Sequence, residues 1–120
     1  ILYGMQQMSS DSDEVRSILS ALLPKVESCT DAFDSQAVSM ALYGMKGMSS
    51  DSSEACSILL ALLPKIGSCE EAFDVKQLSM VFYGLKEMSS DSAEVRSILA
   101  ALLPKLESCE EAFDSQAVNM

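Results

Sequence analysis

The sequence of 120 residues contains no histidine and no tryptophan, and it has only five glycines and three prolines. Without histidine, the chain has no general base for a serine or cysteine nucleophile of the usual triad type. It also has no G-x-S-x-G elbow and no glycine-rich phosphate loop. We therefore predict that the protein is not an enzyme, needs no cofactor and takes no small-molecule substrate.

The four cysteines form no C-x-x-C pair, and three of them, Cys29, Cys69 and Cys109, recur at a fixed interval. If equivalent positions lie on packed neighbouring helices, they are about 8–10 Å apart. A disulfide requires Cα atoms within about 7 Å. We expect free, buried thiols, which are typical of an intracellular, reducing compartment. Cys56 stands where the other copies have arginine.

Basic residues are also scarce: 8 lysines and arginines stand against 18 acidic residues, giving a net charge of −10. This balance argues against passive binding to phosphate backbones or anionic lipid, and it favours basic partners. No apolar run approaches the roughly 18 residues of a membrane span, so we expect no membrane association. The chain begins with isoleucine and has no signal-peptide pattern, which we interpret as a fragment or a processed product.

What the sequence does contain is a gapless internal repeat. Segments 1–40, 41–80 and 81–120 align throughout, and 22 of the 40 positions are the same in all three copies. The absence of any insertion indicates that each copy occupies the same structural position. We expect one domain covering 1–120.

The first predicted helix of each unit runs from about Ser35 to Met48. Asp34 precedes it and is a good N-cap, because its carboxylate can accept from the free backbone N–H groups of the first turn. Phe33 and Val38 have the spacing of a hydrophobic staple across this start. The same arrangement recurs at 73–78 and 113–118.

The second predicted helix begins at Asp51 as N-cap, with Glu54 completing a capping box. Its apolar face continues at steps of three or four residues. That face comprises Ala55, Leu59, Leu62, Ile66, Cys69 and Phe73. Pro64 lies within it and predicts a kink, since the apolar spacing continues. The alternative is a short third helix with Pro64 in its first turn.

A two-helix unit cannot bury its apolar face alone, but stacked units bury a continuous core. We therefore predict an all-α fold, an α-solenoid of three 40-residue helix–turn–helix repeats, truncated at both ends. Residues 1–8 are the tail of one first-type helix, and 114–120 are the start of another. Neither end has the polar capping repeat that such arrays need.

Two segments of the unit, Phe33-Asp34-Ser35-Gln36 and Met40-Ala41-Leu42-Tyr43-Gly44, resemble the octotricopeptide and heptatricopeptide repeats, which are related to the FAST-kinase-like helical repeats. The resemblance covers all three copies. It implies an α-solenoid, single-stranded RNA as partner and an organelle as location. The chain differs in having Tyr43 where that family usually has tryptophan, and Lys76 in place of the glutamine.

Three tyrosines, Tyr3, Tyr43 and Tyr83, recur at the same place in each copy. Regularly spaced aromatic rings can each stack on a nucleic-acid base. We favour ordinary packing, with each hydroxyl at the rim and the following glycine allowing a close helix approach. A glycine in a helix costs about 1 kcal/mol, so a packing reason is expected for it.

Acidic residues cluster where the second helix of one unit ends and the first helix of the next begins, and they predict a carboxylate edge along the stack. The members are Glu27, Asp31, Asp34, Glu70, Glu71, Asp74, Glu107, Glu110, Glu111 and Asp114. Such an edge can meet a basic partner or hold divalent cations. No spacing fits an EF-hand, so we predict no metal site and favour solvated helix ends.

Lys25, Lys65 and Lys105 follow the prolines and form a second periodic set. They can track phosphates, but we favour pairing with nearby carboxylates, each pair contributing under about 1 kcal/mol. The eight methionines also recur periodically on the apolar face. We interpret them as core residues rather than as a promiscuous binding groove.

The candidate partner-binding positions are those that differ between copies at the two ends of the first predicted helix. In a modular binding protein, one or two such positions per repeat select the ligand. They are Gln6, Gln7, Ser35, Gln36, Ser39, Lys46, Val75, Lys76, Ser79, Lys86, Glu87, Ser115, Gln116 and Asn119. Neutral drift at exposed positions is the alternative explanation and accounts for these differences at least as well.

We conclude from the sequence that the chain is a binding scaffold for a protein partner or for neighbouring repeats, within a larger protein or assembly. The alternative is single-stranded RNA binding of the octotricopeptide kind. The positions of Lys46, Lys76 and Lys86 discriminate between the two. Lysines gathered on one concave face favour RNA, whereas lysines scattered among acids favour a protein partner.

Overall fold

The computed structural model describes residues 1–119, which form helices joined by short loops and contain no strand. The elements are η1 (Tyr3–Met5), α1 (Asp13–Ser28), α2 (Ser35–Tyr43), α3 (Ser53–Ser68), α4 (Val75–Gly84), α5 (Ala93–Glu107) and α6 (Ser115–Asn119). The prediction of an all-helical chain is confirmed. No helix in this range has the length and apolarity that crossing a membrane requires.

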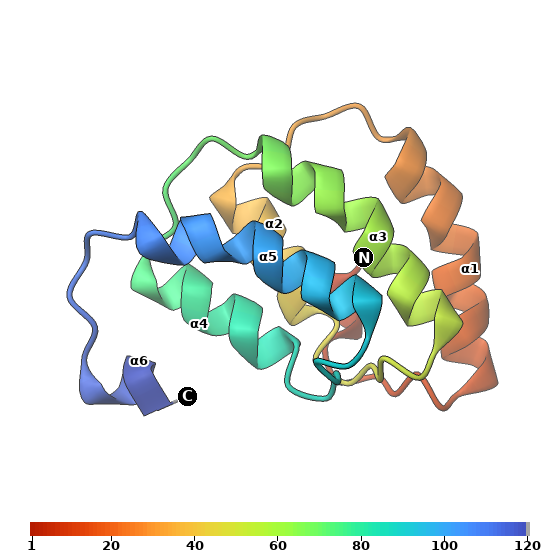
Figure 1. Ribbon diagram of the computed structural model, residues 1–120. Helices are drawn as coiled ribbons and strands as arrows, with labels where there is room; N and C mark the ends of the chain where they lie inside the picture. Colours follow the sequence, from red (N-terminus) through yellow and green to blue (C-terminus); the bar gives the residue numbers. More distant parts are fainter. Residues whose placement is uncertain (120) are drawn as a thin grey trace.

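Helices that are equivalent in the repeat pack side by side (Figure 1). The long-helix row consists of α1, α3 and α5, in which α3 contacts both of the others. The short-helix row consists of η1, α2, α4 and α6, in which each element contacts the next along the row. The molecule measures 41 × 31 × 25 Å.

The core lies between the two rows. The apolar face predicted for the second helix is buried as expected, from Ala55 through Leu59, Leu62 and Ile66 to Phe73. The short helices cover it with residues such as Val38, Leu42, Leu78 and Val81. Burying each such large side chain contributes about 1.5–3 kcal/mol, so this seam dominates the stability of the fold.

The short helices begin at the predicted residues. The Asp34 carboxylate accepts a hydrogen bond from Ala37 N at 2.7 Å, and Asp74 accepts from Gln77 N at the same distance. Gln77 also accepts from Asp74 N, which completes a capping box. The predicted aspartate N-caps are therefore confirmed at α2 and α4.

The long helices begin one residue later than predicted. Ser52, not Asp51, is the N-cap of α3, and its hydroxyl accepts from Ala55 N at 3.2 Å. The same hydroxyl donates to Glu54, so the glutamate binds the cap side chain and not the cap backbone. Asp51 lies in the preceding turn, where its N–H donates to Ser49 Oγ. The predicted Asp51 cap was wrong because a serine hydroxyl can both accept and donate here.

Two other boundaries depend on particular residues. Helix α3 runs without interruption through Pro64 to Ser68, so no third helix forms. Helix α2 ends at Tyr43, short of the predicted Met48. The following residues make three-residue turns, such as Met48 N to Met45 O at 2.8 Å. These turns keep Met45 and Met48 buried with the spacing of a helix.

All four cysteines are free. Only Cys69 is buried, at 3% exposure, because helices lie on both sides of the middle repeat. Cys29 and Cys109 are half-buried, which corrects the expectation of burial at those two positions.

Candidate functional site

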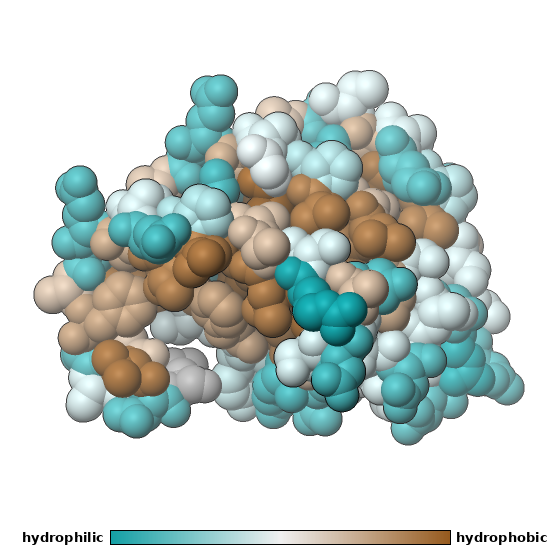
Figure 2. Space-filling model, in the orientation of Figure 1, coloured by the Kyte–Doolittle hydropathy of each residue, from teal (hydrophilic) through white to brown (hydrophobic). Residues whose placement is uncertain are grey.

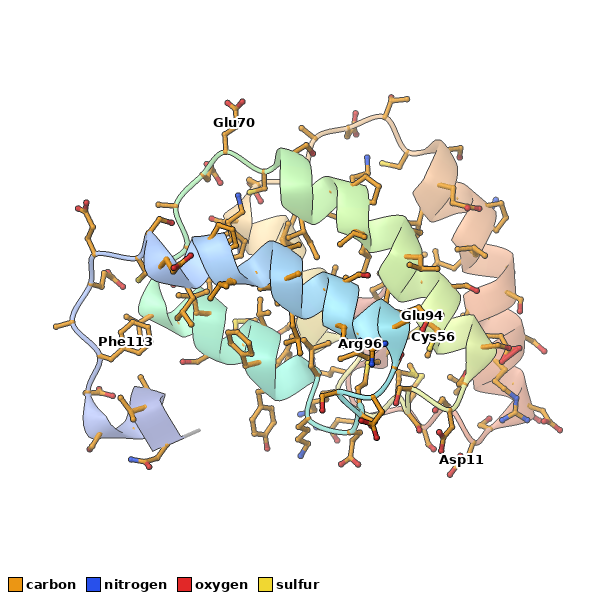
Figure 3. All side chains as sticks on the ribbon, in the orientation of Figure 1. Asp11, Cys56, Glu70, Glu94, Arg96 and Phe113 are labelled. Carbon is orange, nitrogen blue, oxygen red and sulfur yellow. The ribbon has the colours of Figure 1, made fainter. Side chains whose placement is uncertain are left out.

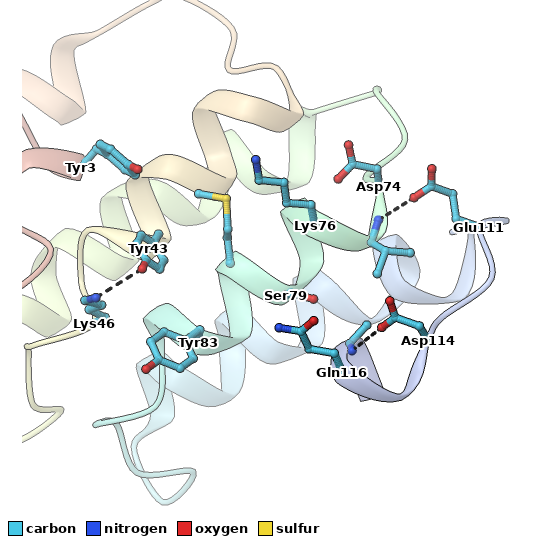
Figure 4. A pocket seen from close by; sticks show the side chains of 13 residues that line it. Tyr3, Tyr43, Lys46, Asp74, Lys76, Ser79, Tyr83, Glu111, Asp114 and Gln116 are labelled. Carbon is cyan, nitrogen blue, oxygen red and sulfur yellow. Dashed lines mark hydrogen bonds between the residues drawn. The ribbon is translucent and has the colours of Figure 1, made fainter. Parts of the chain in front are cut away.

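A groove of about 850 Å³ lies on the short-helix row (Figure 4). We call it the short-helix groove. It is lined by Tyr3, Tyr43, Lys46, Asp74, Val75, Lys76, Ser79, Met80, Tyr83, Glu111, Asp114, Gln116 and Ala117. These residues come from every element of the row and from the loops that precede α4 and α6.

Helix α4 forms the floor of the groove because it is amphipathic. Lys76, Ser79, Met80 and Tyr83 recur at three- or four-residue steps and so share one face. Leu78 and Val81 lie on the opposite face and are buried in the core. The repeat thus directs one face of each short helix to the core and the other to the groove.

Tyr3, Tyr43 and Tyr83 form a row of neighbouring rings along the groove, which we call the tyrosine ladder. The ring centroids of Tyr3 and Tyr43 are 5.9 Å apart at an interplanar angle of 31°. Those of Tyr43 and Tyr83 are 6.2 Å apart at 27°. Both pairs fall within the range of favourable aromatic contacts. The ladder exists because equivalent residues of packed repeats face the same way.

The glycines after Tyr43 and Tyr83 set the spacing of the ladder. A Cβ on Gly44 would come closer than 3.0 Å to the Leu2 carbonyl oxygen, and one on Gly84 would meet the Leu42 carbonyl equally closely. Backbone atoms of the neighbouring repeat occupy that space, so no side chain fits. The expectation that these glycines permit close approach therefore agrees with the structure.

Lysines reach the ladder from its edge. Lys46 Nζ is 3.3 Å from the Tyr43 hydroxyl, 4.9 Å from the Tyr43 ring centroid and 5.6 Å from that of Tyr83. Lys86 Nζ lies 4.5 Å from the Tyr83 centroid, just outside the groove lining. Such cation–π contacts contribute about 0.5–1 kcal/mol at exposed sites. Lys76 is exposed on α4 and projects into the groove.

The other end of the groove carries three carboxylates, each bound to a helix N-terminus. Asp74 and Asp114 cap α4 and α6, and Glu111 accepts a hydrogen bond from Val75 N at 2.8 Å. Glu71 makes the same bond to Ser35 N one repeat earlier, at 2.9 Å. These carboxylates therefore serve as caps, as the favoured interpretation of the acidic edge predicts. No cluster of three metal-ligating side chains occurs within residues 1–119.

Five of the predicted partner-binding residues line the groove: Lys46, Val75, Lys76, Ser79 and Gln116. The others lie elsewhere. Ser35 and Ser39 are buried in the interface, whereas Gln36, Ser115 and Asn119 are exposed on α2 and α6. Gln6, Gln7, Lys86 and Glu87 lie in the turns after η1 and α4. The tyrosines, Met80 and the capping carboxylates were not among the predicted contacts, although their recurrence in every copy was the available signal.

The periodic lysines after the prolines do not pair with carboxylates, contrary to our expectation. Lys65 Nζ donates to the carbonyls of Cys29 and Asp31, at 2.5 and 2.8 Å, and Lys105 donates to the Cys69 carbonyl. The last turn of a helix leaves its carbonyls without partners and carries a partial negative charge. Each lysine therefore joins its long helix to the end of the preceding one.

Perturbed acid groups lie at the start of the long helices, away from the groove. Hydrogen bonding to its own backbone N–H and to the serine N-cap lowers the pKa of Glu14, and Glu94 is lowered in the same way. Burial raises the pKa of the Cys56 thiol, which lies near Glu94 (Figure 3). This arrangement is that of capped helices.

No known protein family, curated protein or solved structure matches the chain. The resemblance to octotricopeptide repeats therefore stays a prediction.

Proposed function

We propose that the chain is a non-catalytic α-solenoid scaffold that binds an extended segment of a partner protein in its short-helix groove. The observation that carries the proposal is the groove itself, with stacked tyrosines at one end and carboxylates at the other. Its volume of about 850 Å³ is typical of a ligand site. Aromatic side chains are also the residues most enriched at the centres of protein interfaces.

Support for the solenoid comes from hydrogen bonds that recur with the sequence repeat. Glu71 and Glu111 each bind a backbone N–H of the preceding unit. Ser49 N donates to Ser10 Oγ at 2.8 Å, and one repeat later Ser89 N donates to Ser50 Oγ at 2.9 Å. The two repeat–repeat contacts are thus built alike, as stacked units require.

The charges of the groove favour a protein segment over a nucleic acid. Two lysines line it against three carboxylates, in a chain of net charge −10. Lys46 is already engaged by the tyrosine ladder. The best-fitting segment carries a lysine or arginine toward Asp114 and Glu111 and an apolar side chain over Met80. Such a segment is complementary in charge to the carboxylate end of the groove and in apolarity to its floor.

Single-stranded RNA is the second candidate, and one observation favours it. Lys46 and Lys76 line the same groove as all three tyrosines, so aromatic stacking and cationic contacts are available together. The groove carboxylates oppose this function, because they repel phosphates at the α6 end.

Selection from a random peptide display library, followed by fluorescence anisotropy of the recovered peptide, tests the proposal. Tyr83→Ala should weaken binding at least about tenfold, the loss expected for an aromatic contact at an interface centre. Leu60→Ala is the control, because Leu60 is exposed on α3 outside the groove. Its affinity should stay within about twofold, and circular dichroism should show that both variants are folded.

Two results would contradict the proposal. One is peptide binding that Tyr83→Ala leaves unchanged, which places the site elsewhere. The other is binding of a randomised single-stranded RNA pool that weakens steeply with salt while no peptide binds. That result would establish the second candidate.

A further inference from the structure

The two ends of the molecule expose residues whose equivalents are buried inside it. Ile18 on α1 is 51% exposed, whereas Ile58 and Ile98 are fully buried, each in a long helix with a preceding helix packed on it. Val118 on α6 is 69% exposed, whereas Val38 and Leu78 are 1% exposed. We call the end of η1 and α1 the N-face and the end of α5 and α6 the C-face.

Apolar side chains mark the C-face as an unpaired surface. Leu106 on α5 is 38% exposed, but the equivalent Ile66 is 1% exposed. Figure 2 shows apolar surface along α5 and on α6. Phe113, in the loop between them, is also exposed (Figure 3), although Phe73 is buried. In the middle repeat, the next repeat covers the equivalent residues, whereas nothing within residues 1–119 covers them on the C-face.

Gly4 shows what the N-face lacks. Gly44 and Gly84 each face a backbone carbonyl of the preceding repeat, that of Leu2 and that of Leu42. A Cβ on Gly4 would meet nothing within 4 Å. The carbonyl that would face Gly4 in the same way belongs to a position one repeat before Leu2. In a second copy placed before this one, the residue at that position is Phe82, the equivalent of Leu2 and Leu42. The open space at Gly4 is therefore where the backbone around Phe82 of a docked copy would lie.

The polar contacts repeat in the same register. Lys65 and Lys105 bind carbonyls at the end of the preceding long helix, and Lys25, their equivalent on the N-face, is exposed. The matching carbonyl on the C-face is that of Cys109. Ser49 N–H donates to the hydroxyl of Ser10 in the preceding repeat. The equivalent donor on the N-face is Ser9 N–H, and the equivalent acceptor at the other end of the molecule is the hydroxyl of Ser90. Both faces thus hold complementary halves of an interface that the molecule already forms twice.

We propose that a second copy of this chain docks head to tail, with its C-face on the N-face of the first. The contacts are those of the internal interface: the Phe82 carbonyl over Gly4, the Cys109 carbonyl on Lys25, and apolar cover for Ile18 and Val118. Tyr83 of the second copy then stacks on Tyr3 and extends the tyrosine ladder across the junction. The short-helix groove becomes continuous between copies.

This interface joins two different surfaces, so each docked copy leaves one N-face and one C-face open. Such a contact adds further copies until a ring closes or a filament grows. We therefore expect association that does not stop at a symmetric dimer.

Sedimentation velocity of the full chain over a range of concentrations tests the proposal. The wild type should show species larger than a monomer that increase with concentration. Gly4→Val should remain monomeric, because its Cβ has room in one copy but would strike the docked carbonyl. Gly67→Val is the matched control, since Gly67 also has nothing within 4 Å and lies outside both faces. It should associate like the wild type.

A mixing experiment tests the head-to-tail geometry. Val118→Asp on the C-face should also be monomeric alone, yet it keeps an intact N-face. Mixed with Gly4→Val, it should form a one-to-one complex and nothing larger. A wild type that sediments as a monomer at every concentration would overturn the proposal. So would association that persists undiminished in Gly4→Val.

Discussion

At the scale of single residues, three glycines at equivalent positions have different surroundings. Replacing Gly44 or Gly84 by alanine drives a methyl group into a carbonyl of the neighbouring repeat. We expect each change to lower the free energy of unfolding by about 1–3 kcal/mol, the usual cost of overpacking. Urea denaturation at low protein concentration measures it.

Gly4→Ala is the control for this prediction, because its methyl group meets no neighbour. Its stability should stay within about 0.5 kcal/mol of the wild type. Equal stability of all three variants would show that the repeats do not approach as closely as described.

Cys56 replaces an arginine and takes over its hydrogen bond. Its thiol lies 3.2 Å from the Ser50 carbonyl, where Arg16 and Arg96 donate to the carbonyls of Ser10 and Ser90. Because burial raises the pKa of the Cys56 thiol, less thiolate is present near neutral pH. Iodoacetamide labelling followed by mass spectrometry should find Cys56 slower than a free cysteine.

In denaturant this difference should disappear, since the unfolded chain exposes the thiol. Labelling of the folded chain that is faster than that of free cysteine would contradict the assignment.

At the scale of helices, Lys65 and Lys105 join neighbouring long helices. Lys65→Met keeps the aliphatic stem but removes the bonds to Cys29 and Asp31. We expect a loss of about 1–2 kcal/mol, since hydrogen bonds from charged groups are worth more than neutral ones but this lysine is only half-buried. Lys25→Met has the same chemistry without a preceding helix and should change stability by less than about 0.5 kcal/mol.

Thermal and urea unfolding of both variants provide the measurement, at low protein concentration, where Lys25 has no docked copy to bind. A loss in Lys25→Met equal to that in Lys65→Met would mean that the carbonyl bonds contribute nothing specific.

The starts of the long helices predict a dependence on pH. Glu14 and Glu94 have pKa values lowered chiefly by backbone hydrogen bonding and also by the serine hydroxyls. The unfolded chain therefore takes up protons before the folded chain does, so these residues stabilise the fold at neutral pH. That contribution to stability is lost as the pH falls below about 4.3, the pKa of glutamate in the unfolded chain, and through the lower pKa values of the folded chain.

Melting temperatures recorded from neutral to acidic pH should show this decline. The double variant Glu14→Gln, Glu94→Gln should show a shallower one. An identical pH profile in the double variant would exclude these two carboxylates as its source.

The sequence was sufficient for the elements but not for every boundary. Asp34 was identifiable as a cap because aspartate recurs at this place in every copy, whereas the serine after it is replaced by Val75 in the middle copy. Asp51 and Ser52 both suit an N-cap, and only the backbone geometry decides between them. The end of α2 at Tyr43 was hidden because three-residue turns keep Met45 and Met48 at helical spacing.

Contacts between repeats were the least predictable features. Lys65 binds carbonyls 36 and 34 residues earlier in the chain, and backbone partners leave no signal in side-chain chemistry. At the scale of the whole molecule, the groove was equally hard to predict, because it also depends on contacts between repeats. Periodicity placed the tyrosines in register, but their stacking depends on the spacing of the short helices, which Gly44 and Gly84 set.

The central claim for the whole molecule is that the short-helix groove is its binding surface. Amide NMR spectra of the labelled chain, titrated with the selected peptide, test it most directly. We expect shifts concentrated at Tyr43, Lys76, Ser79, Tyr83 and Gln116, with α1 and α3 unaffected. Shifts centred on the long-helix row would contradict the claim.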